Sequence, residues 1–308
     1  MQTEQRSTDK RRRALLIVNE SSRTGASHTD AAAAALRNGG LEIFFGTSRR
    51  AADLSPCILA HRDDVDCVVL GGGDGTLNAA ARGLMATGLP LGVLPLGTAN
   101  DFARSVGVPF DLEAAARVIA EGYAHAVDIG EVNGHPFFNV ASVGLAADLA
   151  KRLTREGKRR FGRLSYAITA ARCLMEAAPF HATLLVGNEK VMVRTLQIAV
   201  GNGRYYGGGN VVAPGARIDD QHLDLYSLEF SRIWRMALML PHFKRGEHGA
   251  IREVRTARGV SFEVITRKPR PVNADGELVT HTPAVFTQRP RAINVYVPET
   301  CSLVTVPA

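Results

Sequence analysis

A run of three glycines directly after an apolar segment constrains this chain more than any other feature of its sequence. The apolar segment is Val65–Val69, and Leu70 leads from it into Gly71-Gly72-Gly73-Asp74-Gly75-Thr76-Leu77-Asn78. Glycine leaves backbone N–H groups uncovered and permits positive φ, so the chain can turn tightly and bring its main chain close to an anion. The following segment, 77–85, has the composition of a helix, whose first N–H groups would add to such a site. The sequence therefore predicts a strand, a phosphate-binding turn and a helix.

Asp74 lies in the middle of this turn. Its carboxylate would repel a phosphate group unless it orients a metal-bound water, a hydroxyl group or the loop itself. A turn with a purely structural purpose has little need of a carboxylate there. We therefore count Asp74 among both the candidate catalytic residues and the candidate nucleotide-binding residues.

Apolar and helical segments alternate over residues 14 to about 125. The apolar segments are 14–18, 41–45, 65–70 and 91–94, and the helical ones are 29–37, 77–85, 101–106 and 112–121. This alternation is typical of a parallel sheet with helices on its faces. Ligands bind such sheets at the carboxyl ends of the strands, where the glycine run falls. The sequence thus predicts an α/β nucleotide-binding domain over residues 1–125.

Beyond residue 125 the pattern changes to short segments of strand character. The predicted strands are 126–132, 137–141, 182–186, 191–200, 223–229, 260–265 and 292–297. Turns such as Asn133-Gly134 and Gly187-Asn188 punctuate them, which is typical of antiparallel hairpins. We expect a mainly antiparallel β-sandwich over residues 126–308, with a helical insertion near 145–177. The cleft between the two domains is the default position for a site.

A second unusual loop, Pro95–Arg104, leaves the next predicted strand and enters a helix. It should face the same pocket as the glycine run, because both loops follow neighbouring strands. Thr98 and Asn100 can donate hydrogen bonds to phosphate or ribose oxygens. Asp101 is well placed to cap the following helix. All three are candidate nucleotide-binding residues.

Composition is that of a soluble globular protein. The chain has 308 residues, of which 45% are hydrophobic and 22% charged, enough for two domains with a substantial core. No apolar run approaches the roughly 18 residues that span a bilayer. The four cysteines form no CxxC pair, so neither a zinc site nor a disulfide framework is indicated. A reducing cytoplasm fits this cysteine usage best.

The formal net charge of +7 favours an anionic partner, which could be a nucleotide, a nucleic acid or an acidic membrane surface. Basic residues cluster within 151–163 and alternate there with apolar ones, as in a segment that lies on a membrane. A solvated helix face is the simpler explanation of such a run. Nucleic acid is not expected, because the basic clusters lack a reading helix or an aromatic platform.

The two loops together carry a resemblance. Gly-Gly-Asp-Gly-Thr-Leu-Asn at 72–78, followed by Pro-Leu-Gly-Thr-Ala-Asn-Asp-Phe-Ala-Arg at 95–104, resembles the diacylglycerol kinase catalytic-domain superfamily, and particularly the bacterial YegS-like lipid kinases. Further matching segments are 127–130, 138–144, 201–209, 213–216 and 273–277. The resemblance implies a β-sandwich second domain, with ATP as phosphate donor, Mg²⁺ as cofactor and a lipid hydroxyl as acceptor.

The resemblance also implies roles for single residues. The positions that match nucleotide-binding residues of the family are Thr47, Gly72, Gly73, Asp74, Gly75, Thr76, Leu77, Asn78 and Thr98. Asp275 matches the catalytic base, Asp128 matches a second acid important for activity, and Glu277 is a further candidate for orienting the site. A separate Mg²⁺ site is implied around Arg217, Asp220 and His222, the first and last through their backbone carbonyls.

Two segments depart from the family pattern. Relatives carry Asn-Pro-x-Ser-Gly after the first strand, whereas Glu20 stands here in place of the proline and the glycine is displaced to Gly25. Relatives often carry Asp-Asp-Gly-x-Leu-Asp, whereas Gln221 stands here in place of the glycine. The first change affects the geometry of the loop, and the second weakens the implied Mg²⁺ site.

We therefore expect a cytoplasmic, peripherally membrane-associated kinase that transfers the γ-phosphate of ATP to a diacylglycerol-like or phosphatidylglycerol-like alcohol. One alternative is a soluble-metabolite kinase of the NAD kinase type, which shares Gly-Gly-Asp-Gly but should carry an Asn-x-Gly-x-Leu-Gly-Phe segment that is missing here. Another is a non-catalytic module that binds anionic lipid. The sequence does not decide whether the protein forms a homodimer.

Overall fold

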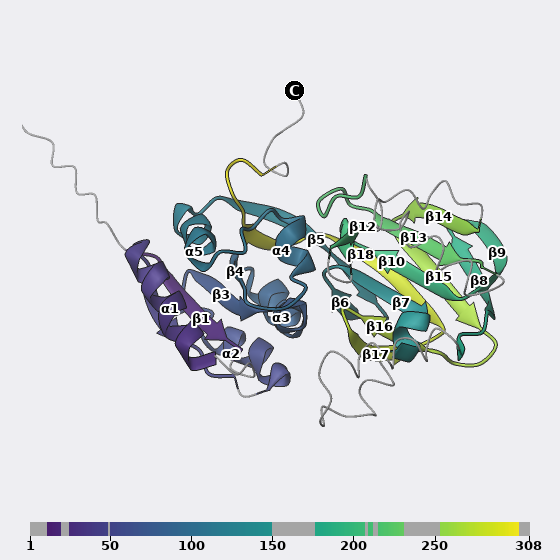
Figure 1. Ribbon diagram of the computed structural model, residues 1–308, viewed down its shortest axis with the longest axis horizontal. Coiled ribbons are helices and arrows are strands. Elements are labelled where there is room, and N and C mark those ends of the chain that lie inside the picture. Colours follow the sequence, from purple (N-terminus) through teal and green to yellow (C-terminus); the bar gives the residue numbers. More distant parts are fainter. Residues whose placement is uncertain are drawn as a thin grey trace, which may run out of the picture.

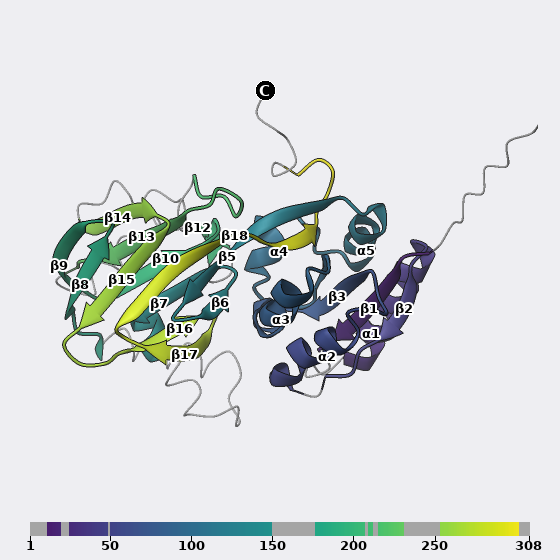
Figure 2. The same cartoon turned by 180° about the vertical axis from the view of Figure 1, so that it is seen from behind.

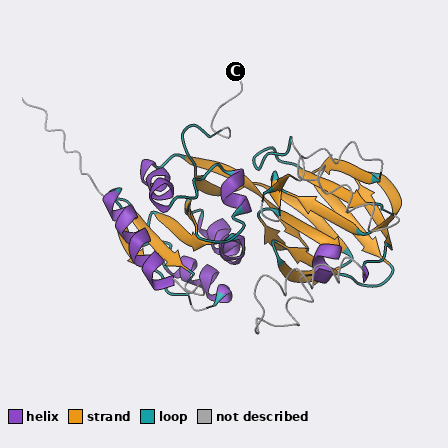
Figure 3. Cartoon of the chain, viewed as in Figure 1, coloured by secondary structure: helices purple, strands orange, loops and turns teal. Residues whose placement is uncertain are grey.

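Two domains lie side by side in the computed structural model, which describes residues 11–19, 25–48, 50–149, 176–206, 209–211, 215–230 and 253–301 (Figure 1). Helices gather in the first domain, and the second is built almost wholly of strands (Figure 3). The prediction of an α/β domain followed by a mainly antiparallel β-sandwich is confirmed.

The first domain contains four parallel strands in the order β2-β1-β3-β4. These strands are β1 (Arg13–Val18), β2 (Glu42–Phe45), β3 (Cys67–Gly72) and β4 (Leu91–Pro95). Its helices are α1 (Gly25–Asn38), η1 (Ala51–Asp53), α2 (Leu54–Ala60), α3 (Asp74–Thr87), α4 (Asp101–Ser105) and α5 (Leu112–Glu121). The strands β1, β3 and β4 are almost completely buried. This explains why they appear in the sequence as continuous apolar segments.

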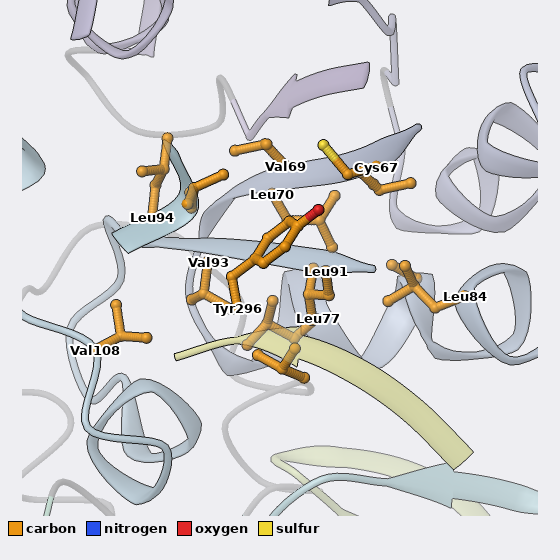
Figure 4. Packing of buried hydrophobic residues seen from close by; sticks show 14 of the residues in the cluster. Cys67, Val69, Leu70, Leu77, Leu84, Leu91, Val93, Leu94, Val108 and Tyr296 are labelled. Carbon is orange, nitrogen blue, oxygen red and sulfur yellow. The ribbon is translucent and has the colours of Figure 1, made fainter. Parts of the chain in front are cut away.

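The last strand, β18 (Ala284–Tyr296), returns from the second domain into the first. It pairs antiparallel with β5 (Ala124–Val132) along most of its length and parallel with β4 at Val295. Both long strands therefore run through the two domains (Figure 2). Tyr296 is 4% exposed and packs among side chains of β3 and β4, including Leu70 and Leu91 (Figure 4). The core of the first domain thus includes residues beyond 125, and a boundary at that residue stays a prediction.

The second domain packs two antiparallel layers against each other. One sheet has the order β14-β13-β10-β7-β16-β17. Its strands are β7 (Val140–Gly144), β10 (Gln197–Gly201), β13 (Leu223–Leu228), β14 (Val254–Gly259), β16 (Pro271–Ala274) and β17 (Glu277–His281). The facing layer continues β18 through β15 (Ser261–Thr266), β8 (Phe180–Val186) and β9 (Glu189–Thr195). Short strands complete the described part of this domain, namely β6 (His135–Phe137), β11 (Tyr205–Tyr206) and β12 (Asn210–Val211).

Two predicted strands are each divided in the structure. The segment 191–200 forms parts of β9 and β10, which are separated at Leu196, where the buried Thr195 hydroxyl donates to the carbonyls of Gln197 and Leu228. The segment 137–141 is interrupted at residues 138–139, whose N–H groups donate to a carboxylate instead of a neighbouring strand. In both places a side chain takes over hydrogen bonds that a strand ladder would make.

The helix α2 is not among the helices predicted from the sequence. Pro56 lies in the first turn of this helix, where backbone N–H groups make no hydrogen bond within the helix, so proline is tolerated there. Ser55 further fixes the helix by donating to the carbonyl of Ala79 in α3 and by accepting from Gly83 N–H. The helix therefore depends on contacts with a distant segment.

Several predictions concern residues that the structure does not describe. The basic segment 151–163 and residues 20–24 lie outside the described residues, as does most of the helical insertion predicted near 145–177. Within the described ranges, no helix is both long and apolar enough to cross a bilayer. No disulfide joins two of the described cysteines, Cys57, Cys67 and Cys301.

The two predicted loops touch through their glycines. A Cβ atom added at Gly73 would lie 3.1 Å from the Cα of Gly97, and one added at Gly97 would overlap Gly73. We expect Gly97→Ala to lower the free energy of unfolding by ~1–3 kcal/mol, because this backbone contact has no room for a methyl group. Urea unfolding measures this change.

Gly75→Ala is the matched control, because nothing lies within 4 Å of a Cβ at that position. Alanine in the first turn of α3 should leave the stability unchanged or raise it by about 0.5–1 kcal/mol. Equal losses in the two variants would contradict the proposed contact between the loops.

Candidate active site

The second loop is held in shape by Asn100, which has a φ of 51° at the position before α4. Its Oδ1 accepts from Gly97 N–H at 3.0 Å, and its Nδ2 donates to the carbonyls of Pro95 and Gly97 at 3.1 and 2.9 Å. Both amide hydrogens therefore hold the turn itself. Thr98 is exposed on the same loop. Direct contacts of Asn100 and Thr98 with a nucleotide stay predictions.

Asp74 joins three segments of the chain. Its carboxylate accepts from the backbone N–H groups of Asp101 at 3.2 Å and Phe102 at 3.0 Å, and from the Asn139 side chain at 3.1 Å. It therefore orients the loop itself, the last of the three possibilities that the sequence left open.

The expected cap of α4 comes from a different residue. Asp101 is the first residue of α4, so its side chain does not cap the helix, and the carboxylate of Asp74 takes that role. The carboxylate of Asp101 instead accepts from Gly209 N–H at 2.7 Å. The sequence could not show this, because Asp74 precedes the helix by 27 residues.

Asp275 is enclosed by hydrogen-bond donors from both domains. Oδ1 accepts from the N–H groups of Asn139 and Val140 at 3.0 and 3.1 Å. Oδ2 accepts from Phe138 N–H at 2.6 Å and from the Asn78 side chain at 3.0 Å. A carboxylate has about four acceptor positions, so these donors fill them. The residue itself has a φ of 45° in the turn between β16 and β17.

The environment of Asp275 has two opposing effects on the pKa of its carboxyl group. Burial raises the pKa of this carboxyl to about 6, whereas the hydrogen bonds from Phe138, Val140, Asn78 and Asn139 oppose that rise because they favour the charged form. A carboxyl group with this pKa is ionised at pH 7 and still binds a proton readily. Such a pKa is suited to a group that accepts a proton during a reaction.

The two domains meet through a pair of asparagines. Asn78, in the second turn of α3, donates to Asp275 and to the carbonyl of Pro136, both at 3.0 Å. Asn139, between β6 and β7, donates to Asp74. Each carboxylate is thus bound by a side chain from the opposite domain, so the glycine turn and Asp275 form one hydrogen-bonded unit.

A cavity of about 520 Å³ lies beside this unit. Gly73, Gly75 and Thr76 line it from the first domain, and Glu277 lines it from the second. Gly72 is buried at the end of β3, and Leu77 is buried in α3, so these two positions support the turn from behind. Three of the predicted nucleotide-binding positions therefore line one cavity, and two more lie directly behind them.

The sequence analysis missed three residues that line this cavity, namely Asn19, Ser48 and Arg50. Asn19 directly follows β1 and donates to the Thr76 hydroxyl at 3.2 Å. Ser48 lies after β2, next to the exposed Thr47. The signal that could have found them is position, because polar residues at the carboxyl ends of neighbouring parallel strands meet at one edge of the sheet.

Asp128 lies outside this cavity and is fully buried, with 0% exposure. Its Oδ1 accepts from Arg291 N–H and its Oδ2 from Gln221 N–H, both at 2.7 Å. Both donors have positive φ, 51° for Arg291 and 60° for Gln221. Asp128 therefore holds two strained backbone positions, and its importance for activity stays a prediction.

The predicted Mg²⁺ ligands lie together in one turn. The carboxylate of Asp220 accepts from the N–H groups of Arg217 and His222, both at 3.0 Å, and from the Arg258 guanidinium at 2.6 Å. Gln221 keeps the positive φ for which relatives use glycine. The Arg258 guanidinium balances the charge of Asp220, so Mg²⁺ would compete with it for this carboxylate, and the Mg²⁺ site stays a prediction. No group of three or more His, Cys, Asp or Glu side chains suited to a metal occurs in the described ranges.

The glycine turn at the end of β3 and the Asp275 carboxylate from the β-sandwich thus lie together, as the resemblance of the two loops to a kinase family implies. Family models agree with it. A model described as "Diacylglycerol kinase catalytic domain" matches residues 13–132, and one described as "YegS C-terminal NAD kinase beta sandwich-like domain" matches residues 139–297.

Known proteins show the same relationship. The chain is 32% identical over 297 residues to a protein of Pseudomonas aeruginosa strain PAO1 named "Probable lipid kinase YegS-like", with 95% of this chain and 97% of the relative covered. It is 28% identical over 242 residues to a diacylglycerol kinase of Staphylococcus carnosus strain TM300, with 78% and 79% covered. The crystal structure of a diacylglycerol kinase from Bacillus anthracis str. Sterne is similar with a TM-score of 0.76 at 25% identity, with 94% and 98% covered.

The chain therefore belongs to the YegS-like lipid kinases, a family of enzymes with a diacylglycerol kinase catalytic domain. This confirms the family and the enzyme class expected from the two loops.

Asp74→Ala tests whether this carboxylate holds the loops together. The change leaves two backbone N–H groups and the Asn139 amide without their acceptor, so we expect the free energy of unfolding to fall by about 2 kcal/mol together with a loss of turnover. Chemical unfolding and a kinase assay measure the two effects.

Asp111→Ala is the matched control, since Asp111 caps α5 through a single bond to Ala114 N–H at 2.9 Å. It should cost about 1 kcal/mol of stability and leave turnover unchanged. An Asp74→Ala protein as stable and as active as the unmodified protein would remove Asp74 from the site.

Proposed function

We propose that this enzyme transfers the γ-phosphate of ATP to the hydroxyl group of a diacylglycerol-like or phosphatidylglycerol-like lipid. One observation carries the proposal above the others. Asn78 of the glycine-turn helix donates to the carboxylate of Asp275, so a phosphate site and a proton acceptor belong to one hydrogen-bonded unit. The names of the relatives support the lipid acceptor.

ATP would lie in the cavity beside the glycine turn. Glycines at 73 and 75 leave backbone N–H groups accessible there, and Thr76 adds a hydroxyl group close to them. Thr47 and Thr98 are exposed near the ends of the neighbouring strands, where they could contact the nucleotide. Mg²⁺ is expected to accompany ATP in this family, and its ligands in this chain stay a prediction.

Asp275 would orient the lipid hydroxyl group and accept its proton. Phosphoryl transfer needs an aligned acceptor, a neutralised phosphate chain and a group that takes the proton late in the reaction. Since all acceptor positions of Asp275 are filled, the hydroxyl group must replace one donor. Asn78 supplies the only one of these hydrogen bonds that comes from a side chain, so it can move without disturbing the backbone.

The remaining expectations belong to the same proposal. A cytoplasmic location is supported by the scattered cysteines, which form no CxxC pair, and contact with an anionic membrane surface by the net charge of +7. A homodimer and the exclusion of nucleic acid as a partner stay predictions.

An assay with radiolabelled ATP tests the proposed transfer directly. Diacylglycerol, phosphatidylglycerol, ceramide and sphingoid bases are offered in mixed micelles, and NAD is the soluble control. Label is expected in diacylglycerol or phosphatidylglycerol. Label in NAD alone would favour the soluble-metabolite kinase, and absence of label from every acceptor would favour the non-catalytic lipid-binding module.

Asp275→Asn tests whether Asp275 is the residue that accepts the proton. The amide keeps the size of the side chain but cannot take a proton, so we expect turnover to disappear while ATP binding is largely retained. Glu277→Gln is the matched control, because this exposed carboxylate lies two residues away and lines the same cavity. An active Asp275→Asn protein together with an inactive Glu277→Gln protein would transfer the role to Glu277.

The pH dependence of turnover reports the ionisation of Asp275. Only the ionised form accepts a proton, and burial raises the pKa of this group to about 6. We therefore expect kcat to rise about tenfold per pH unit below pH 6 and to level off above it. A kcat that stays constant down to pH 5 would contradict the assignment.

The ionisation of Asp275 also makes the free energy of unfolding depend on pH, in the opposite direction to kcat. Asp275 in the unfolded chain ionises near pH 4, so the folded protein holds the proton more tightly between about pH 4 and pH 6. Its contribution to the free energy of unfolding therefore falls as the pH rises through this window. Circular dichroism over the same range shows whether a change in kcat is accompanied by unfolding.

A further inference from the structure

A second cavity, of about 650 Å³, lies at the opposite end of α4 from Asp74. Asp74 binds the first N–H groups of this helix, whereas Arg104 and Ser105 at its end line the cavity. Arg204 and Arg217 line it as well, and none of its described lining residues is acidic. Three guanidinium groups thus line a cavity that is separate from the one beside the glycine turn.

Arg104 is the most constrained of the three. The centre of its guanidinium group lies 4.8 Å from the ring centre of Phe110 and 5.9 Å from that of Tyr205, so cation–π contacts fix its position. Its Nε is buried and has no hydrogen-bond partner among the described residues. A buried donor without an acceptor is unfavourable, and an anion in the cavity would supply one.

The other two arginines differ in how far their charges are balanced. Arg217 binds Asp219 through two hydrogen bonds of 3.0 and 3.1 Å, and Asp219 in turn binds His125, so this guanidinium is held in place and largely neutralised. Arg204 is exposed, lies 5.6 Å from the ring of Tyr205 and makes no ion pair in the described part of the chain. Arg104 and Arg204 therefore leave two positive charges unbalanced.

We infer that this cavity binds a phosphate group, carried either by a free phosphate compound or by the headgroup of an anionic lipid. Guanidinium groups bind phosphate oxygens through paired, charge-assisted hydrogen bonds, and stacking on aromatic rings reduces the cost of ordering them. Two unbalanced charges match the charge of a phosphate monoester. The inference rests on the lining of this cavity and not on the transfer reaction.

Calorimetric titration of the full chain with inorganic phosphate tests the inference. The double variant Arg104→Gln/Arg204→Gln should bind at least tenfold more weakly than the unmodified protein, and Arg204→Gln alone should bind a few-fold more weakly. Arg117→Gln, which changes an exposed arginine on α5 outside the cavity, is the control and should bind as before. Arg204→Gln also keeps the test valid where Arg104→Gln prevents folding.

Phosphate that binds at the glycine turn would still bind in all these variants. The second cavity is therefore measured by the part of the phosphate binding that is lost when the arginines are replaced. Equal affinities of the double variant and the unmodified protein would overturn the inference, as would absence of binding at millimolar phosphate. Vesicles of phosphatidylcholine with and without phosphatidic acid, whose headgroup is a phosphate monoester, distinguish the two sources. A partition onto the anionic vesicles that falls in the double variant supports the lipid headgroup, and an unchanged partition supports the free compound.

Discussion

Three consecutive backbone N–H groups, at residues 138–140, take part in the hydrogen bonds of the Asp275 carboxylate. The rest of the site depends on this interaction. It separates β6 from β7, which belong to different sheets, and it fixes the turn after β16 against the first domain. Asn78 adds a fourth donor from α3. Hydrogen bonds between these segments therefore fix the distance between the glycine turn and the carboxylate.

Asp74 and Asp128 stabilise loops in the same way as Asp275. Each accepts hydrogen bonds from backbone N–H groups of segments that are distant in the sequence, and Asp128 holds two residues with positive φ. Acidic residues of the family pattern thus serve here as supports of the loops around the cleft. A loss of activity after their substitution would not by itself show that they touch a substrate, which is why stability has to be measured beside turnover.

Local patterns in the sequence were sufficient to predict the four parallel strands and four of the helices of the first domain, together with both loops. The apolar segments of β1, β3 and β4 are buried on both faces, and the glycines at 73 and 97 are required where the loops touch. What could not be predicted depends on contacts between distant residues. The return of β18 beside β4, the capping of α4 by Asp74 and the pairing of Arg258 with Asp220 leave no periodic signal. The resemblance to a family supplied the importance of Asp275, but not its hydrogen bonds.

Hydrogen exchange of the amides of Phe138, Asn139 and Val140, followed by NMR, tests the central interaction most directly. These amides donate to a side chain between two strands, so they should exchange as slowly as the amides inside β7 and β10, and Asp275→Ala should remove the protection of Phe138 and Asn139 first. Exchange as fast as that of an open loop in the unmodified protein would contradict the account, because Asp275 would then not organise the junction of the domains.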